Sequence, residues 1–186
     1  EEDNSDLRKK NLEKFINNFW KCWYIGEGNY KLHPILPAVI ESCKRNNYKK
    51  ELFEQFFNSM RMDINQNTCI TFKDTFDYMK GSASVIGDFM IPILMPKSTN
   101  IEKNKALPYA RDLGNAFQLT NMIRDINEDL DLRRHYIPVE LCQKYEINLN
   151  DREKNINKKN FLNLIEDLFY RTDKLYVSAD IGISML

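Results

Sequence analysis

Apolar residues recur at steps of three and four along most of the chain, which is the spacing of amphipathic α-helices. The pattern predicts helices over about residues 7–24 and 33–46, and then a third whose apolar stripe ends near Met60. Asp63 lies three residues beyond Met60, so it is either an inward carboxylate or part of a frayed helix end. The inward positions of the three helices are Leu12, Phe15, Ile16, Phe19 and Trp23, then Leu36, Val39, Ile40 and Cys43, then Leu52, Phe53, Phe56, Phe57 and Met60. An all-α fold is therefore expected.

A fourth helix is predicted over about residues 74–94, and it contains an unusual group of small residues. They are Gly81, Ser82, Ala83, Ser84 and Gly87. Each glycine costs a helix roughly 1 kcal/mol relative to alanine. Two explanations are open: the small residues let another helix pack closely, or they leave room for a ligand beside this one.

A fifth helix is predicted over about residues 107–130, and the composition of its polar side is unusual. With about 100° per residue, one arc holds Gly114, Gln118, Asn121, Asp125 and Asp129. The roughly opposite side holds Ala116, Leu119, Ile123, Ile126 and Leu130. A solvent-exposed polar face is one explanation. Against it, residues 106–143 contain no lysine, and glycine, asparagine and aspartate are mediocre helix formers that an exposed face has little reason to prefer.

Asp125 and Asp129 offer carboxylates that can bind metal ions, which would explain the polar side of this helix. Their spacing places two carboxylates about 5–6 Å apart on one helix ridge, which is too far to chelate one small ion but suits neighbouring metal ions that bridge to a diphosphate. Mg²⁺ keeps several waters and takes one or two carboxylates, while substrate phosphate oxygens fill other positions. Arg124, Arg133 and Arg134 can supply fork-shaped donors to the same phosphates. The ridge therefore suits a diphosphate whose departure is assisted by metal ions and arginines.

The charge balance argues against a nucleic-acid partner. The chain has 27 Lys and Arg residues and 27 Asp and Glu residues, so no net field draws it to nucleic acid or an anionic membrane. Its length of 186 residues, with 42% hydrophobic and 29% charged content, fits one globular domain. The cysteines form no C-x-x-C pair, so Cys22, Cys43, Cys69 and Cys142 are expected to be buried free thiols in a reducing compartment.

The most apolar stretch, residues 85–96, is interrupted by Asp88 and Pro92 and is shorter than the roughly 20 residues of a membrane span. No transmembrane helix is expected, and no signal peptide is visible. The chain opens with EEDNSD and stops at GISML, as an excerpt of a longer protein would. We expect a cytoplasmic protein, free or peripheral at a membrane, and leave organellar targeting open.

The stretch LGNAFQLTNMIRDINEDLDLRRHYIP, residues 113–138, closely resembles the second aspartate-rich motif of the squalene and phytoene synthases, the trans head-to-head prenyl synthases. LFEQFFNSMRMDI resembles the helix before the family's substrate cavity, and FDYMKGSASVIGDFMIPIL resembles its cavity helix. YVSADIGISML is similar to the segment that opens the late helices. The resemblance implies an all-α, isoprenoid-synthase-type helical bundle around a central cavity.

Carried over by position, the resemblance makes Asp125 and Asp129 ligands of a Mg²⁺ cluster, with Mn²⁺ as an alternative ion. Tyr78 would lie near the reacting carbons and join the two aspartates as a catalytic residue. The substrate-binding residues would be Gln118 and Asn121 beside the metals, Arg124 and Arg134 on diphosphate, and Ser82, Ile86, Gly114 and Phe117 along the isoprenoid tails. Arg133 stands where the family commonly has glycine, and His135 is expected to be a surface residue without a role.

The implied activity is condensation of two prenyl diphosphates. The motifs look more like phytoene synthases, so the expected reaction joins two geranylgeranyl diphosphates into phytoene, through a cyclopropylcarbinyl diphosphate, in carotenoid biosynthesis. Squalene or dehydrosqualene synthesis is the nearest alternative; squalene would add NADPH, for which no G-x-G-x-x-G is present. A third possibility is a non-catalytic homologue that assists respiratory-complex assembly, although the intact Asp125 and Asp129 favour an enzyme. Expected partners are the prenyl diphosphates and a membrane surface that receives the lipid product; the oligomeric state is left open.

The family builds its site from two facing aspartate motifs, of which this sequence contains the second. EEDNSDLRKKNLEKF, residues 1–15, resembles what directly follows the first motif. Residues 1–186 are therefore expected to form one domain that lacks the N-terminal helices with that motif and the last C-terminal helices. The segment NLNDREKNINKKN, residues 148–160, is expected to be a solvated connection before the final helix.

Overall fold

The computed structural model describes residues 5–25, 33–65, 68–149 and 158–186. Within these ranges the chain is helical and forms no β-strand beyond an isolated bridge between Thr68 and His135. The elements are α1 (Ser5–Ile25), α2 (Leu36–Arg45), α3 (Lys50–Ile64), α4 (Phe72–Met79), the π-helix η1 (Lys80–Ser84), α5 (Val85–Leu94), α6 (Asn100–Arg124), α7 (Ile126–Asp131), α8 (Val139–Lys144) and α9 (Lys158–Ile183). The expected all-α fold is confirmed.

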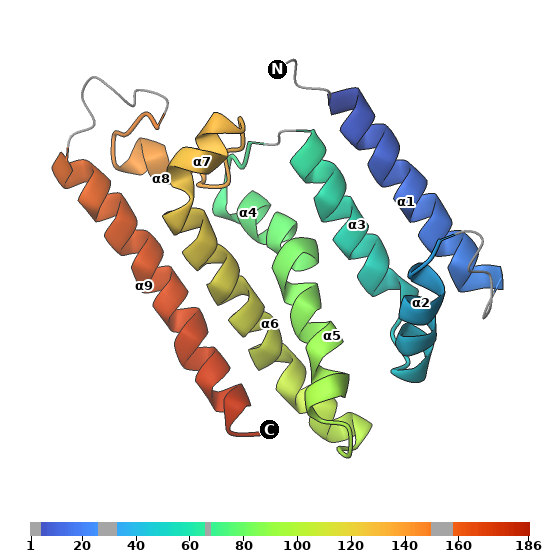
Figure 1. Cartoon of the computed structure of the whole chain (residues 1–186). Helices are drawn as coiled ribbons and strands as arrows, with labels where there is room; N and C mark the ends of the chain where they lie inside the picture. Colours follow the sequence, from blue (N-terminus) through green and yellow to red (C-terminus); the bar gives the residue numbers. More distant parts are fainter. Residues whose placement is uncertain (1–4, 26–32, 66–67, 150–157) are drawn as a thin grey trace.

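The long helices of the described chain lie side by side in a row (Figure 1). Along this row α1 packs on α3, α3 on η1, α5 and η1 on α6, and α6 on α9. Helices α4, α7 and α8 gather at one end of the row, around the last residues of α6 (Figure 1). This arrangement brings residues from distant parts of the sequence to one end of α6.

Aromatic side chains hold the first helices together. Phe19 of α1 is 3% exposed, and its ring centroid lies 4.9 Å from that of Phe53 and 5.1 Å from that of Phe57, both on α3. Two positions predicted to face inward are wrong: Phe15 is 41% exposed and Val39 is 39% exposed. Phe15 nevertheless makes edge contacts with the rings of His33 and Phe57.

The predicted fourth helix is one continuous run of α4, η1 and α5, and it starts two residues earlier than predicted. A Cβ on Gly81 would lie 2.1 Å from the carbonyl oxygen of Gln55, and one on Gly87 would lie 2.5 Å from that of Ala110. Close packing against α3 and α6 therefore explains these two glycines. Pro92 lies inside α5 without ending it.

The predicted fifth helix is wrong at its start and in its continuity. Helix α6 begins at Asn100, because Thr99 forms a capping box with Glu102, and it runs through Pro108. The helix ends at Arg124, since Asp125 has φ −100° and ψ 16°, and α7 follows. The predicted apolar side is confirmed for Ala116, Leu119, Ile126 and Leu130, which are all buried.

Buried residues of α4, α6, α8 and α9 form the largest apolar core, in which Met79, Leu164 and Leu168 have no exposed surface. All four cysteines are buried and carry free thiols, as expected. The connection expected over residues 148–160 falls mainly outside the described residues, and its last three residues belong to α9.

None of the helices in the described part of the chain has the length and apolar character needed to cross a bilayer.

Candidate functional site

The ridge of polar residues on α6 continues across the helix break into α7. The backbone N–H of Asp125 donates to the carbonyl of Asn121 at 2.8 Å, and that of Asp129 donates to the carbonyl of Asp125, also at 2.8 Å. These i to i−4 hydrogen bonds keep the helical repeat through the break. Asn121 is exposed, whereas Gln118, Asp125 and Asp129 are half-buried. The structure therefore brings the predicted amides and carboxylates to one end of α6.

Arg124 is paired with the first carboxylate of this ridge. Its Nε and Nη2 donate to the two oxygens of Asp125 at 2.6 and 2.7 Å. This side-chain hydrogen bond holds the pKa of Asp125 below its ordinary value of 3.8. Both groups are accessible, because Arg124 is 68% exposed and Asp125 29%. The pair can therefore open to let each partner meet a ligand.

Asp129 lies in a different environment, although it is one turn away from Asp125. Its pKa is raised to about 6: burial is the largest cause, Arg134 acts against it, and the charges of Asp125, Glu128 and Asp63 add to the increase. The backbone N–H of Arg134 donates to the carbonyl of Asp129 at 2.7 Å, which holds the turn after α7 against this position. Several negative groups thus converge where a cation would relieve their repulsion.

The carboxylates fit a Mg²⁺ ion that shares its coordination with a phosphate. Mg²⁺ takes one or two protein carboxylates and completes its shell with water and phosphate oxygens. Asp125 and Asp129 can each offer a carboxylate to such an ion, and the carboxylates of Asp125, Glu128 and Asp63 contribute to the raised pKa of Asp129 after burial, its largest cause. Among the described residues no group of three or more His, Cys, Asp or Glu could hold a metal ion by itself.

Tyr78 lies below this end of α6, inside the core, and it is 4% exposed. Its ring stacks on Tyr136 with centroids 4.7 Å apart. The hydroxyl of Tyr136 donates to Oδ1 of Asp63 at 2.6 Å. Asp63 belongs to α3 and is half-buried, so it is an inward carboxylate and not a frayed end. Burial raises the pKa of Tyr78 to about 12.

An apolar cavity of about 250 Å³ lies between α5, α6 and α9. Three of the predicted tail-binding residues, Ile86, Gly114 and Phe117, line it. Ser82 does not; it lies one turn before Ile86, and its hydroxyl donates to the carbonyl of Tyr78 at 3.2 Å. Gly114 belongs both to the polar arc of α6 and to the lining of this cavity, and it precedes Asp125 by eleven residues, or about 16 Å of helix.

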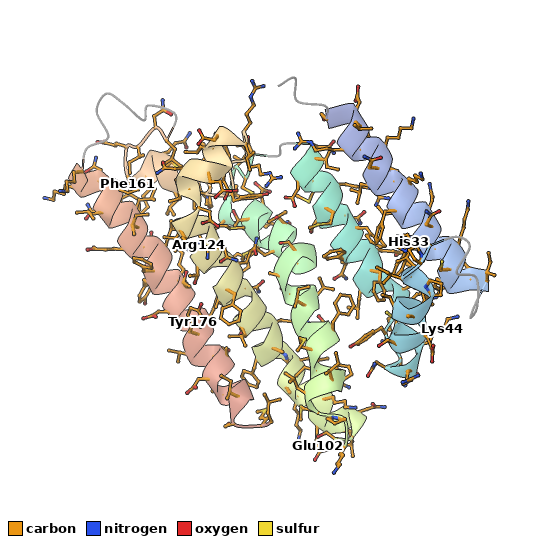
Figure 2. All side chains as sticks on the ribbon, viewed as in Figure 1. His33, Lys44, Glu102, Arg124, Phe161 and Tyr176 are labelled. Atoms are coloured by element: carbon orange, nitrogen blue, oxygen red, sulfur yellow. The ribbon has the colours of Figure 1, made fainter. Side chains whose placement is uncertain are left out.

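Helix α9 supplies residues that the sequence did not single out. The ring of Tyr176 lies 5.9 Å from that of Phe117, and its hydroxyl is 3.0 Å from Oγ1 of Thr120. Figure 2 labels Tyr176 on α9 and Arg124 near the end of α6, and Phe117, which Tyr176 contacts, lines the cavity. Sequence spacing within one helix cannot reveal such a contact across 56 residues.

Two residues after the ridge shape the chain near the site. Arg133 has φ 57°, a left-handed conformation that favours glycine, which explains why a glycine suits this position. The carbonyl of His135 accepts from the backbone N–H of Cys69 at 2.9 Å, and its side chain is half-buried. His135 thus serves the backbone link between the α3–α4 connection and the turn after α7.

Comparisons with known proteins match both the sequence and the fold. The family described as squalene/phytoene synthase matches residues 2–186. The chain is 27% identical to a phytoene synthase from Pseudescherichia vulneris, over 84% of this chain and 49% of that protein. It is 34% identical to a presqualene diphosphate synthase from Rhodopseudomonas palustris, over 63% of this chain and 41% of that protein. The chain thus spans about half or less of the length of these relatives.

Two solved structures share the fold at low sequence identity. A dehydrosqualene synthase in complex with a ligand aligns with 98% of this chain and 62% of its own, with a TM-score of 0.81 and 20% identity. A squalene synthase from Alicyclobacillus acidocaldarius aligns with 94% of this chain and 63% of its own, with a TM-score of 0.79 and 19% identity. Together with the family match over residues 2–186, these findings establish that the chain belongs to the squalene/phytoene synthase family.

Proposed function

We propose that the full-length protein condenses two prenyl diphosphates head to head, and that it converts two geranylgeranyl diphosphates into phytoene through a cyclopropylcarbinyl diphosphate. The observation that carries this proposal is the layout of α6. A carboxylate and arginine ridge lies at one end, and Gly114, about 16 Å back along the same helix, lines an apolar cavity. A molecule with a diphosphate head and a long isoprenoid tail matches both parts.

The polar end of α6 would bind the diphosphate. Asp125 and Asp129 would hold Mg²⁺, or Mn²⁺ in its place, and a bound ion would neutralise the negative charge of the leaving diphosphate. Arg124 would exchange its carboxylate partner for phosphate oxygens, since its side chain is 68% exposed and accessible to a ligand. Arg134 and the amides of Gln118 and Asn121 would orient the same group from the sides.

Tyr78 would act on the reacting carbons as a neutral phenol. Its pKa of about 12 keeps the hydroxyl protonated at any physiological pH. An aromatic ring attracts a cation to its face, and this attraction is stronger where water is excluded. The ring would therefore stabilise the allylic cation that forms when the first diphosphate leaves, and later the cation of the rearrangement.

The apolar cavity would hold an isoprenoid tail. Its lining is almost wholly hydrocarbon, and Ile86, Gly114 and Phe117 contribute to it from α5 and α6. Ser82 would meet the tail nearer to the reacting carbons, one turn closer to Tyr78. A facing aspartate motif, which the resemblance places before residue 1, would supply the second half of the metal and phosphate site.

Squalene or dehydrosqualene synthesis is the second candidate. It is favoured by the likeness to a presqualene diphosphate synthase at 34% identity. Both reactions use the same ridge and differ in tail length and in the use of NADPH. A non-catalytic role in respiratory-complex assembly is less well supported, because both carboxylates and both arginines of the ridge are in place. The lipid product would bring the enzyme to a membrane surface.

Product analysis separates these candidates. The full-length protein is incubated with the C15 and the C20 diphosphates and Mg²⁺, each with and without NADPH. Phytoene formed from the C20 substrate without NADPH is the expected result. Consumption of the C15 substrate alone would overturn the phytoene assignment. Consumption of neither substrate by the folded protein would favour the assembly role.

A further inference from the structure

Asp63, Tyr136 and Tyr78 come from three separate parts of the fold and meet beneath the polar ridge. Asp63 is near the end of α3, Tyr78 is in α4, and Tyr136 follows α7. Together with Arg134, Met62 and Cys69 they line a cavity of about 10 Å³, which is about the volume of a single water. The side chains therefore lie around a common space that is no larger than one water.

The hydrogen bonds of this group run in one direction. The hydroxyl of Tyr78 donates to that of Tyr136 at 3.5 Å, and the hydroxyl of Tyr136 donates to Oδ1 of Asp63 at 2.6 Å. The second bond is short and ends on a carboxylate, which makes it the stronger of the two. Asp63 therefore decides where the hydroxyl of Tyr136 points, and that hydroxyl in turn is the acceptor for Tyr78.

The backbone around both tyrosines is fixed independently of Asp63. Ser59 donates to the carbonyl of Tyr78 at 2.8 Å, and Thr75 donates to the carbonyl of Tyr136 at 2.9 Å. What remains free is the orientation of the two stacked rings. An acceptor at residue 63 removes that freedom by fixing the far end of the Tyr136 ring.

We propose that Asp63 is a positioning residue, which acts through Tyr136 to hold the ring of Tyr78 in the orientation that faces the reacting carbons. The proposal rests on the catalytic role proposed for Tyr78. It assigns Asp63 a task separate from metal binding: its oxygen is an acceptor for a tyrosine hydroxyl, and its charge is not what the reaction uses. Tyr136 then carries the orientation from α3 to α4.

Three substitutions separate hydrogen-bond acceptance from charge. Asp63→Leu removes both the acceptor and the charge, whereas Asp63→Asn removes the charge and keeps a carbonyl acceptor. Tyr136→Phe keeps the stacked ring and removes the hydroxyl that links the other two residues. Asp77→Asn is the matched control, since Asp77 precedes Tyr78 directly but its carboxylate pairs with Lys73 and Lys80 on the surface.

Turnover is measured in the full-length protein with C20 diphosphate. We expect Asp63→Leu and Tyr136→Phe to lower kcat by about 10- to 100-fold with little change in KM, because a misplaced group loses transition-state contacts. Asp63→Asn should retain most of the turnover of the parent, because the asparagine carbonyl still accepts the hydrogen bond of Tyr136. Equal losses in Asp63→Asn and Asp63→Leu, or turnover in Asp63→Leu and Tyr136→Phe equal to that of the Asp77→Asn control, would overturn the proposal.

A second measurement does not depend on catalysis. NMR spectra are recorded of substrate-free protein with ¹³C-labelled tyrosine. The chemical shifts of the Tyr78 ring should change in Asp63→Leu and Tyr136→Phe, and they should stay unchanged in Asp63→Asn and Asp77→Asn. Unmoved Tyr78 signals in Tyr136→Phe would overturn the positioning role even if Asp63→Leu fails to fold. If the protein consumes no prenyl diphosphate while these signals move as expected, the positioning stands and the proposed function fails.

Discussion

Asp125 and Asp129 are four residues apart, yet their surroundings shift their pKa values in opposite directions. Arg124 lowers the pKa of Asp125, whereas burial and neighbouring carboxylates raise that of Asp129 to about 6. A charged Asp129 is therefore unfavourable in the free protein. Ionisable groups with strongly shifted pKa values are frequent at functional sites.

This difference predicts that Asp129→Asn stabilises the protein at neutral pH. The folded pKa of Asp129 lies above its ordinary value of 3.8, so its contribution to stability is full below that value and is lost as the pH rises through about 6. Asparagine avoids this loss. In urea unfolding without divalent metal, the free energy of unfolding of Asp129→Asn should exceed that of the parent by about 1–2 kcal/mol near pH 7.5, after allowance for solvent screening. Near pH 3.5 the two proteins should be equally stable.

Asp125→Asn is the control for this measurement. The lowered pKa of Asp125 means that its contribution is present above the unfolded value and is lost as the pH falls. Removing its charge should not stabilise the protein near pH 7.5. An equal gain in both variants at that pH would show that the burial of Asp129 is not the cause.

Arg133 provides a second residue-scale prediction, because its φ of 57° is strained for any residue with a Cβ. Arg133→Gly should raise the free energy of unfolding by about 0.5–1 kcal/mol. Leu132→Gly, at a φ of −82°, should lower it instead. Thermal unfolding of the two variants checks the pair, and a loss in Arg133→Gly comparable to that in Leu132→Gly would contradict the strain.

At the scale of the element, the π-helix η1 lies between Tyr78 and the cavity-lining residues of α5. Such wide turns cost hydrogen-bond geometry and occur frequently at functional sites. Here the wide turn contains Gly81, where α3 packs so closely that a Cβ would lie 2.1 Å from the carbonyl oxygen of Gln55. The two features together set the register of Tyr78 relative to Ile86.

Gly81→Ala tests this close approach. The added Cβ would lie 2.1 Å from the carbonyl oxygen of Gln55 and 2.4 Å from Oγ of Ser59. To relieve this clash the backbone of α3 would have to shift, which costs free energy. We expect a loss of about 2–3 kcal/mol in urea unfolding. Lys80→Ala, at the exposed neighbouring position, should stay within about 0.5 kcal/mol of the parent. A Gly81→Ala protein as stable as the Lys80→Ala control would argue against tight packing of α3 on η1.

Amphipathic spacing was enough to predict the main helices and the buried side of α6 and α7, since burial of Leu119 and Leu130 follows directly from that pattern. It could not predict η1, because a wide turn depends on what packs against the helix. The break at Asp125 was missed for a similar reason: the hydrogen bonds from Asp125 and Asp129 preserve the repeat, so the pattern of side chains passes through it.

At the scale of the whole molecule, the cavity depends on α5, α6 and α9 together. Periodicity within one segment cannot show which helices meet. The pattern therefore does not identify Ala110 as a residue of the cavity or Tyr176 as its neighbour. Asp63 was noticed on its stripe, but its bond to Tyr136 spans 73 residues and appears only in the folded chain. The family resemblance supplied the candidate roles that spacing could not.

Ala110→Leu tests whether the cavity holds the isoprenoid tail. Ala110 lines the cavity, so a larger side chain there would shorten the space of about 250 Å³. Each methylene that a pocket must reject is worth roughly 1–3 kcal/mol, so kcat/KM for the C20 substrate should fall by about 10-fold or more relative to the C15 substrate. Asp173→Ala, on the exposed side of α9, should leave that ratio unchanged. An unchanged ratio in Ala110→Leu would place the tail elsewhere.

The most direct measurement compares single-turnover consumption of C20 diphosphate by the full-length protein with that of Asp125→Asn and Asp129→Asn, across a range of Mg²⁺ concentrations. An amide has nearly the size of a carboxylate but is a much poorer ligand for Mg²⁺. We expect Mg²⁺-dependent turnover in the parent, and in each folded variant a loss of about 100-fold or more in the first half-reaction. Full activity of either variant at ordinary Mg²⁺ would remove these carboxylates from the site and contradict the proposed function of the α6 ridge.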